Sequence, residues 1–170
     1  MGYSILEIKG SELKLLQLGI LNLKRVPNHA VKLRKIFDHT SELITEYLPD
    51  EMAIEAQFFG KNVQSMLKLG RAQGVAIAAA ISRDIPYVEY APKKVKQSVT
   101  GNGNASKEQV ARTLAHILHL PETDTLYDAT DALSVALCHH YQSGSMVASP
   151  AKGSSASWKG FLANNPHRIK

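Results

Sequence analysis

The sequence contains a single cysteine and no long run of apolar residues. Because Cys138 has no second cysteine to pair with, an internal disulfide and a cysteine-based zinc site are excluded. The longest apolar stretch, residues 75–81, is far shorter than the roughly 20 residues that cross a bilayer, and no secretory signal is visible. With 170 residues, the chain is long enough for one domain with a substantial core. We therefore expect a cytoplasmic globular protein without a membrane partner.

A nucleotide-binding loop is also absent from the sequence. Residues 101–103 read Gly-Asn-Gly, but the Gly-Lys-Ser/Thr of a Walker loop does not follow them. Four histidines, His116, His119, His139 and His140, are not spaced like the ligands of a zinc-binding helix. The histidine pattern therefore favours ordinary core or surface positions over a transition-metal site.

Acidic residues are missing from three stretches of the chain, residues 56–83, 90–107 and 143–170. The basic residues in these stretches are Lys61, Lys68, Arg71 and Arg83, then Lys93, Lys94, Lys96 and Lys107, and finally Lys152, Lys159, Arg168 and Lys170. The formal net charge of the chain is +5. Such segregated positive charge favours contact with a phosphate backbone, although a run of charges is also typical of a solvated face.

Three carboxylates stand out against this basic background. Asp128 and Asp131 are three residues apart, so on a helix they project from the same face. Glu55 ends a short apolar run that is typical of a buried strand. Carboxylate oxygens are preferred ligands of Mg²⁺, which binds through one or two of them together with substrate phosphate. The three acids therefore indicate a divalent-metal site, although an Asp pair at this spacing is also common at the start of a helix.

The hydrophobic pattern predicts an α/β chain. Strands are expected at residues 2–9, 13–23, 52–58 and 87–90, with the first two forming a hairpin. Helices are expected at residues 30–48, 62–83, 92–99, 106–120 and 127–141, and Ser106 with Gln109 forms a capping box for the fourth. The Ser-, Gly- and Lys-rich composition of residues 143–170 predicts a flexible basic tail, which leaves residues 1–142 as the folded domain.

The second predicted helix is crowded with small residues, among them Gly70 and Gly74. Glycine lowers helix propensity, but it lets another backbone approach closely. This face is therefore expected to be a packing interface, either within the chain or with a second subunit.

Three segments of the chain resemble the bacterial RuvC-type Holliday junction resolvases, and the resemblance runs from residue 2 to about residue 142. The segments are AIEAQFFGKNVQSMLKLGRAQGVA (53–76), EYAPKKVKQSVTGNGNASKEQV (89–110) and DATDALSVALCHHY (128–141). The resemblance implies an RNase H-like fold, with a mixed sheet flanked by helices. It also implies a homodimer that uses four acidic residues and Mg²⁺ to nick two opposed strands of a four-way DNA junction. Two Mg²⁺ ions per site are expected, with Mn²⁺ as the alternative ion, and the branch-migration motor complex is an expected partner.

The resemblance also assigns roles to individual residues. Glu55, Asp128 and Asp131 match the second, third and fourth acids of the family's metal site. Phe58 matches the aromatic residue that contacts bases, and Lys96 and Lys107 match the basic residues near the scissile phosphate. Further expected DNA contacts are Phe59, Lys61, Asn62, Lys93 and Lys94. The helix around Gly70 and Gly74 falls where the family builds its dimer interface.

One segment of the family pattern is not found. The family begins with a strand that ends in Asp-Pro-Gly, whose aspartate is the first metal ligand, whereas this chain opens with Met1, Gly2 and Tyr3. The first central strand and its acid are therefore expected to be missing, so neighbouring strands are expected to lack a ladder partner. Two alternatives to a junction endonuclease stay open on this basis: a catalytically impaired junction-binding protein, and a nuclease of the same fold that acts on RNA hybrids.

Overall fold

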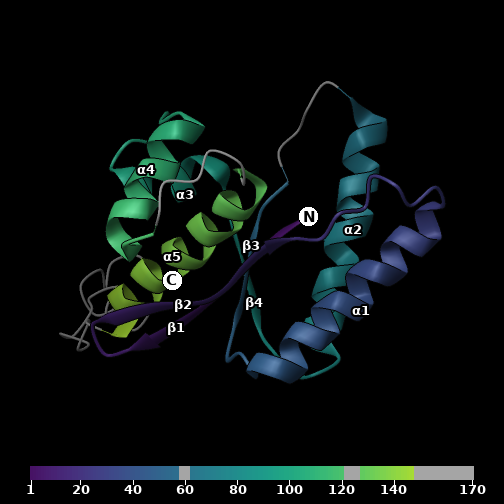
Figure 1. Cartoon of the computed structure of the whole chain (residues 1–170), viewed down its shortest axis with the longest axis horizontal. Helices are drawn as coiled ribbons and strands as arrows, with labels where there is room; N and C mark the ends of the chain where they lie inside the picture. The colour runs from purple at the N-terminus through teal and green to yellow at the C-terminus, as the bar shows by residue number, and fades with distance from the viewer. Residues whose placement is uncertain (58–61, 121–126, 148–170) are drawn as a thin grey trace, which may run out of the picture.

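The computed structural model describes residues 1–57, 62–120 and 127–147. Figure 1 shows four strands with helices on both sides of them. In chain order the elements are β1 (Gly2–Lys9), β2 (Glu12–Ile20), α1 (His29–Tyr47), β3 (Met52–Glu55), α2 (Val63–Ile81), β4 (Tyr87–Tyr90), α3 (Pro92–Thr100), α4 (Lys107–Leu118) and α5 (Tyr127–Val147).

The strands pair in two separate ladders. β1 and β2 form the predicted antiparallel hairpin, with a shift of register between Ile5 and Leu6. β3 and β4 are parallel, and Glu55 lies opposite Tyr90 at the end of their ladder. No ladder joins the two pairs within the described ranges. Parallel and antiparallel pairing are thus both present, as expected for an α/β chain with mixed pairing.

The helices lie in two groups on either side of the strands (Figure 1). α1 packs against α2, where Ile44 and Ala80 form a small buried cluster with Ile85. α3, α4 and α5 contact one another on the other side. α5 also contacts all four strands, so it connects the hairpin with the parallel pair.

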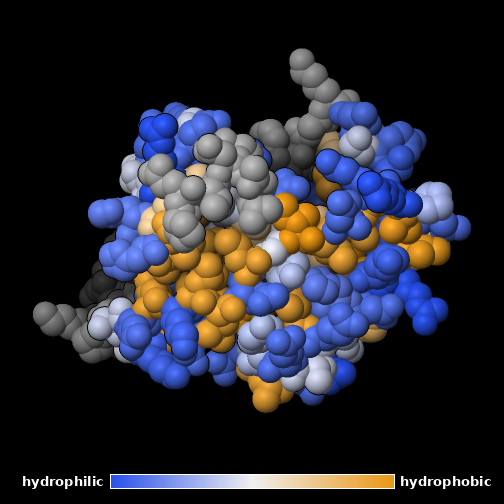
Figure 2. Space-filling view, in the orientation of Figure 1, coloured by the Kyte–Doolittle hydropathy of each residue, from blue (hydrophilic) through white to orange (hydrophobic). Residues whose placement is uncertain are grey.

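Three buried residues of α5, Ala129, Leu133 and Leu137, recur every four positions, which places them on one face of the helix. Ala129, Leu133, Leu137 and Cys138 are completely buried. Leu133 and Leu137 pack into the largest cluster, together with Leu114 of α4. In the orientation of Figure 1, apolar side chains extend across the hairpin region of the surface (Figure 2). Leu residues of β1 and β2 pack against the cluster there and are themselves only partly buried.

Several predicted boundaries were wrong by a few residues. β2 ends at Ile20 and not at residue 23, because its partner strand begins at Gly2. β3 ends at Glu55 and not at residue 58, because its partner β4 ends at Tyr90, just before Pro92 opens α3. Proline has no N–H with which to continue a ladder.

The predicted tail began too early. α5 continues to Val147, so residues 143–147 are helical and only residues 148–170 of the predicted tail lie outside the described part. Serine and glycine have low helix propensity, but extending an existing helix costs much less than starting one. Cys138 is buried and free, and no helix in the described ranges is long and apolar enough to cross a bilayer.

Candidate active site

Two of the three predicted acids meet the two lysines that were predicted to lie near the scissile phosphate in one small hollow. Glu55 is the last residue of β3 and Asp131 lies in the first turns of α5, while Lys96 belongs to α3 and Lys107 opens α4. These four residues line a hollow of about 30 Å³, whose other lining residues are Pro92, Val95, Val110 and Ser134. A hollow of this volume has room for about one water molecule or a bare ion.

Lys107 is bound directly to Asp131. Its Nζ donates a hydrogen bond to Oδ2 of Asp131 over 2.7 Å, and the two side chains are 55% and 41% exposed. This hydrogen bond is the main reason why the pKa of Lys107 is raised; the charges of Asp131, Asp128 and Glu55 add to it, and burial opposes it. Lys107 therefore stays positively charged and neutralises Asp131 in the absence of other cations.

The surroundings of Glu55, unlike those of Lys107, disfavour its charged form. Burial around its carboxyl group raises its pKa, and the nearby charge of Asp131 raises it further, against the opposing charges of Lys107 and Lys96. The residue as a whole still reaches solvent. The hollow thus pairs two carboxylates with two lysines, and burial at Glu55 is a cost that a bound cation would offset.

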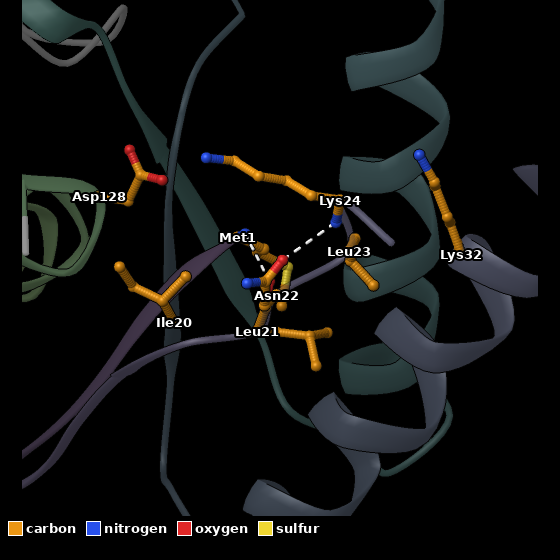
Figure 3. A pocket seen from close by; sticks show the side chains of 8 residues that line it. All are labelled: Met1, Ile20, Leu21, Asn22, Leu23, Lys24, Lys32 and Asp128. Atoms are coloured by element: carbon orange, nitrogen blue, oxygen red, sulfur yellow. Dashed lines mark hydrogen bonds between the residues drawn. The ribbon is translucent and has the colours of Figure 1, made fainter. Parts of the chain in front are cut away.

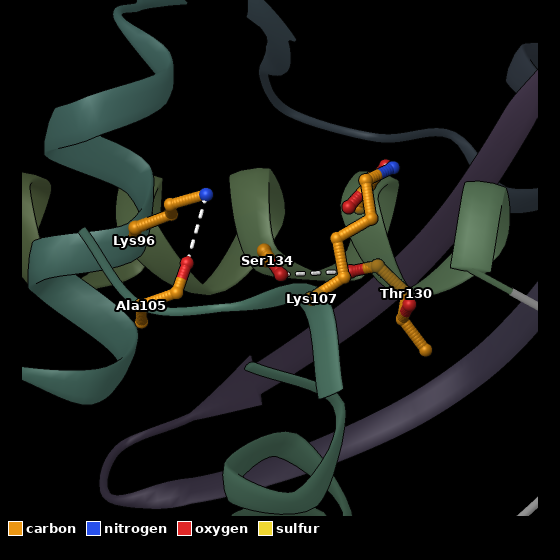
Figure 4. A network of polar contacts seen from close by, with 6 residues as sticks. Lys96, Ala105, Lys107, Thr130 and Ser134 are labelled. Atoms are coloured by element: carbon orange, nitrogen blue, oxygen red, sulfur yellow. Dashed lines mark hydrogen bonds and ion pairs between the residues drawn. The ribbon is translucent and has the colours of Figure 1, made fainter. Parts of the chain in front are cut away.

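The loop between α3 and α4 fixes the two lysines. Lys96 Nζ donates a hydrogen bond to the carbonyl oxygen of Ala105 over 2.8 Å (Figure 4). Ser106 and Gln109 form the predicted capping box at the start of α4, so Lys107 becomes the first residue of that helix. Figure 4 shows both lysines directed toward α5 from these two elements.

Asp128 lies apart from the small hollow. It is exposed at the start of α5 and lines a second, larger hollow of about 520 Å³ with Met1, Lys24 and Lys32 (Figure 3). Its charge still raises the pKa of Lys107. Glu55 and Asp131 therefore line one hollow and Asp128 lines another, so a single site of three acids stays a prediction.

The contact between β1 and α5 requires glycine at position 2, which sequence reasoning did not predict. A Cβ atom on Gly2 would lie 1.7 Å from the carbonyl oxygen of Asp128. No side chain fits at that distance, so β1 touches the start of α5 backbone to backbone. The signal in the sequence was the glycine itself, which nothing else in the hairpin required.

The described residues contain no group of three His, Cys, Asp or Glu side chains already arranged to hold a metal ion. Glu55 and Asp131 nevertheless fit Mg²⁺, because this ion commonly binds through one or two carboxylates and takes its other ligands from water and substrate phosphate. The structural observation that supports this fit is that both carboxylates line the same small hollow.

The other predicted DNA contacts are exposed outside the lining of the hollow or lie outside the described part. Lys93 and Lys94 are exposed on α3, and Lys94 Nζ is 6.0 Å from the centre of the Tyr90 ring. Asn62 is exposed and caps α2, since its Oδ1 accepts a hydrogen bond from the backbone N–H of Ser65. Phe58, Phe59 and Lys61 lie outside the described residues.

The two glycines of α2 face open space. Gly70 and Gly74 are exposed, and a Cβ atom on either would meet nothing within 4 Å. Within the described part of the chain nothing packs at these two positions, and a second subunit stays a prediction.

A polar connection between α5 and the parallel strands was also missed by sequence reasoning. His139 Nδ1 lies 2.8 Å from the hydroxyl oxygen of Tyr90, and its Nε2 contacts Oε2 of Glu51. These residues are 49 and 88 positions from His139 in the chain, and no sequence pattern links them.

Comparison with known proteins identifies the family. The family model described as crossover junction endodeoxyribonuclease RuvC matches residues 1–139. A crossover junction endodeoxyribonuclease RuvC from Cytophaga hutchinsonii is 59% identical over 170 residues, which cover 100% of this chain and 82% of that protein. Its counterpart from Porphyromonas gingivalis is 52% identical over 100% of this chain and 91% of that protein.

A solved structure agrees with this assignment. The chain matches Thermus thermophilus RuvC in complex with Holliday junction substrate with a TM-score of 0.73 and 28% identity, over 84% of this chain and 87% of that one. Because the family model matches from residue 1, the prediction of an absent first strand gains no support. The expected RNase H-like architecture is confirmed by this neighbour. This chain belongs to the crossover junction endodeoxyribonuclease RuvC family.

Proposed function

We propose that this protein is an endonuclease that resolves four-way DNA junctions by paired nicks and depends on Mg²⁺. The observation that carries this proposal is the hollow in which Glu55, Asp131 and Lys107 meet at the junction of β3, α4 and α5. The relatives are named for cleavage at crossover junctions, and one solved relative is bound to a Holliday junction. Action on recombining DNA also implies a cytoplasmic location.

Each residue of the hollow has a distinct role in this reaction. Glu55 and Asp131 hold Mg²⁺ or Mn²⁺, with Asp128 as a third carboxylate nearby. When bound, such ions activate a water molecule and neutralise charge on the phosphate that is cut. Lys107, whose Nζ lies 2.7 Å from Oδ2 of Asp131, would use its ammonium group to stabilise negative charge that develops on the phosphate. Lys96, tied to Ala105, adds a fixed positive charge beside it.

The exposed lysines of α3 extend this positive surface away from the hollow. Lys93 and Lys94 are exposed and follow the ladder that ends at Glu55 and Tyr90. Neutralisation of phosphates by such lysines gives affinity that does not depend on sequence and falls steeply with salt. They support binding of the junction arms, while cleavage depends on the carboxylates.

The decisive experiment compares nicking of a four-way junction, a linear duplex and an RNA–DNA hybrid, each with Mg²⁺ and with EDTA. We expect paired nicks in the junction alone and only with the ion. Binding of the junction without nicking would support the catalytically impaired alternative. Cleavage of the hybrid would instead support the RNA-directed nuclease, and cleavage of the linear duplex at the same rate would contradict junction selectivity.

We further propose that the protein is a homodimer joined through the α2 face that carries Gly70 and Gly74, and that the branch-migration motor complex is its partner. Two identical sites related by a two-fold axis suit the near two-fold symmetry of a junction. Exposed apolar side chains at helical spacing on the same face, Val63 and Leu67, support a covered face.

Gly70→Ala provides a test with opposite effects on the subunit and on the dimer. In the subunit the added methyl group meets nothing, so α2 is expected to gain about 0.5–1 kcal/mol of helix stability. In the dimer the methyl group keeps the two helices apart, so dissociation measured by analytical ultracentrifugation is expected at higher protein concentration. Ser65→Ala, on the exposed first turn of α2, serves as the control. An unchanged dimer constant in Gly70→Ala would place the interface elsewhere.

Phe58→Ala is expected to impair incision without loss of thermal stability. Phe58 follows Glu55 by three positions, where the chain has already left the β3–β4 ladder. Stacking of an aromatic ring on an unpaired base contributes about 1–3 kcal/mol, so junction opening should weaken by roughly that amount. Fluorescence of a base analogue at the crossover measures the opening, and calorimetry measures stability. A large drop in melting temperature would assign Phe58 to the core.

A further inference from the structure

His139 connects α5 to both ends of the parallel strand pair that carries Glu55. Glu51 directly precedes β3, and Tyr90 ends β4 opposite Glu55. His139 lies eight residues beyond Asp131 on α5, which corresponds to about 12 Å along a helix. The three residues Glu51, His139 and Tyr90, here called the His139 bridge, therefore join the helix of one metal-binding acid to the strand of the other.

Each ring nitrogen of His139 has its own hydrogen-bond partner in the bridge. Tyr90 is 8% exposed and lies in a buried cluster with Val95, Val135 and Cys138. Its hydroxyl oxygen lies 2.8 Å from Nδ1 of His139, and the hydroxyl group donates to Nδ1 in the tautomer that carries its hydrogen on Nε2. Nε2–H of the neutral imidazole then donates to the carboxylate of Glu51. Each donor has an acceptor in this arrangement.

The bridge supplies a constraint that the apolar contacts of α5 do not. Burial of Leu133, Leu137 and Cys138 determines which face of α5 turns toward the strands. Hydrophobic contact is non-directional, so it restricts sliding along the helix axis only weakly. A hydrogen bond loses most of its strength with a displacement of about 1 Å, so two of them at one residue fix that position.

We propose that His139 is a positioning residue that sets the location of α5 along the parallel strands and thereby the separation of Asp131 from Glu55. The proposal rests on the proposed metal-dependent function, because that separation has a consequence only where both carboxylates bind one ion or neighbouring ions. Side chains that orient metal ligands from outside the site typically change metal affinity by about 10–100-fold when they are replaced.

The test replaces each polar atom of the bridge separately. Tyr90→Phe removes only the hydroxyl group, and His139→Leu removes both ring nitrogens. His139→Asn keeps a polar atom near the place of Nδ1, whereas His139→Gln keeps one near the place of Nε2. His140→Leu is the matched control, because His140 is the next residue of α5 and its ring lies against Tyr141.

Two quantities are measured on the full chain: binding of Mn²⁺ without DNA, followed by its EPR signal, and the Mg²⁺ concentration that gives half-maximal junction nicking. We expect Tyr90→Phe and His139→Leu to weaken Mn²⁺ binding about tenfold and to raise the half-maximal Mg²⁺ concentration by a similar factor. His139→Asn should restore binding to within about threefold of the wild type, because the buried link to Tyr90 is retained. His139→Gln should behave like His139→Leu, and His140→Leu like the wild type.

The outcomes separate this role from general packing. If Tyr90→Phe and His139→Leu bind Mn²⁺ as tightly as the wild type, or if His139→Asn is no better than His139→Leu, the positioning role is overturned. It is also overturned if affinity follows melting temperature across all variants, His140→Leu included. Tyr90→Phe keeps the test valid if His139→Leu does not fold. If the Asp131→Asn variant binds Mn²⁺ as tightly as the wild type, the proposed metal site itself is contradicted.

Discussion

Asp131→Asn is expected to abolish metal-dependent nicking, with a loss on the order of 10³-fold or more, because metal ligands act as a unit. Asparagine has the same size and still offers an oxygen to Lys107, whose Nζ lies 2.7 Å from the present carboxylate, so the fold is retained. Single-turnover nicking of a labelled junction measures the loss. A variant that nicks at the wild-type rate would show that another carboxylate holds the ion.

The same variant separates binding from cleavage. In EDTA, removal of a negative charge beside a phosphate cannot weaken binding electrostatically, so the junction affinity should persist or increase. Asp38→Asn is the control, because Asp38 forms an exposed pair with Arg34 on α1, on the opposite side of the strands from the hollow. That variant should retain both nicking and affinity, and a loss of either would reveal a general effect of charge removal.

Leu133→Ala is expected to cost about 2–5 kcal/mol of unfolding free energy, because Leu133 is completely buried and the substitution leaves a cavity. For a chain of this size the melting temperature falls by about 2–4 °C per kcal/mol. Differential scanning calorimetry measures the change. Ile8→Ala, at a position that is 42% exposed, should cost much less. Equal losses in the two variants would contradict the assignment of the core to the α4–α5 side.

Leu133 also lies two residues beyond Asp131, on the face of α5 that is turned inward. Leu133→Ala should therefore also weaken metal binding by the molecules that remain folded, because α5 loses part of the packing that holds it in place. Leu133→Ala thus lowers both stability and metal affinity, whereas Asp131→Asn removes the metal ligand and leaves the packing in place.

Local patterns predicted most of the fold. Alternation gave β1 and β4 with their observed bounds, and the Ser106–Gln109 pair gave the start of α4, because these signals lie within a few consecutive residues. The ends of β2, β3 and α5 were not predicted correctly. A strand ends where its partner ends, and the partner is not visible in the local sequence.

The roles of the residues in the candidate site were predicted through the resemblance to a known family. Glu55, Asp131, Lys96 and Lys107 meet as expected, while Asp128 faces a different hollow. The ion pair between Lys107 and Asp131, the close approach of Gly2 to Asp128 and the His139 bridge were not predicted. All three join residues that are far apart in the chain, and their existence depends on how α5 is placed against the strands.

The separation of the strands into two ladders has a consequence for local unfolding. In the described part of the chain, no strand pairing joins the β1–β2 and β3–β4 ladders, and α5 contacts both. Amide protons of the hairpin and of the parallel pair can therefore exchange with solvent in independent opening events. A ligand that immobilises the start of α5 would slow exchange in both ladders together, so hydrogen exchange would report occupation of the site from amides that never touch it.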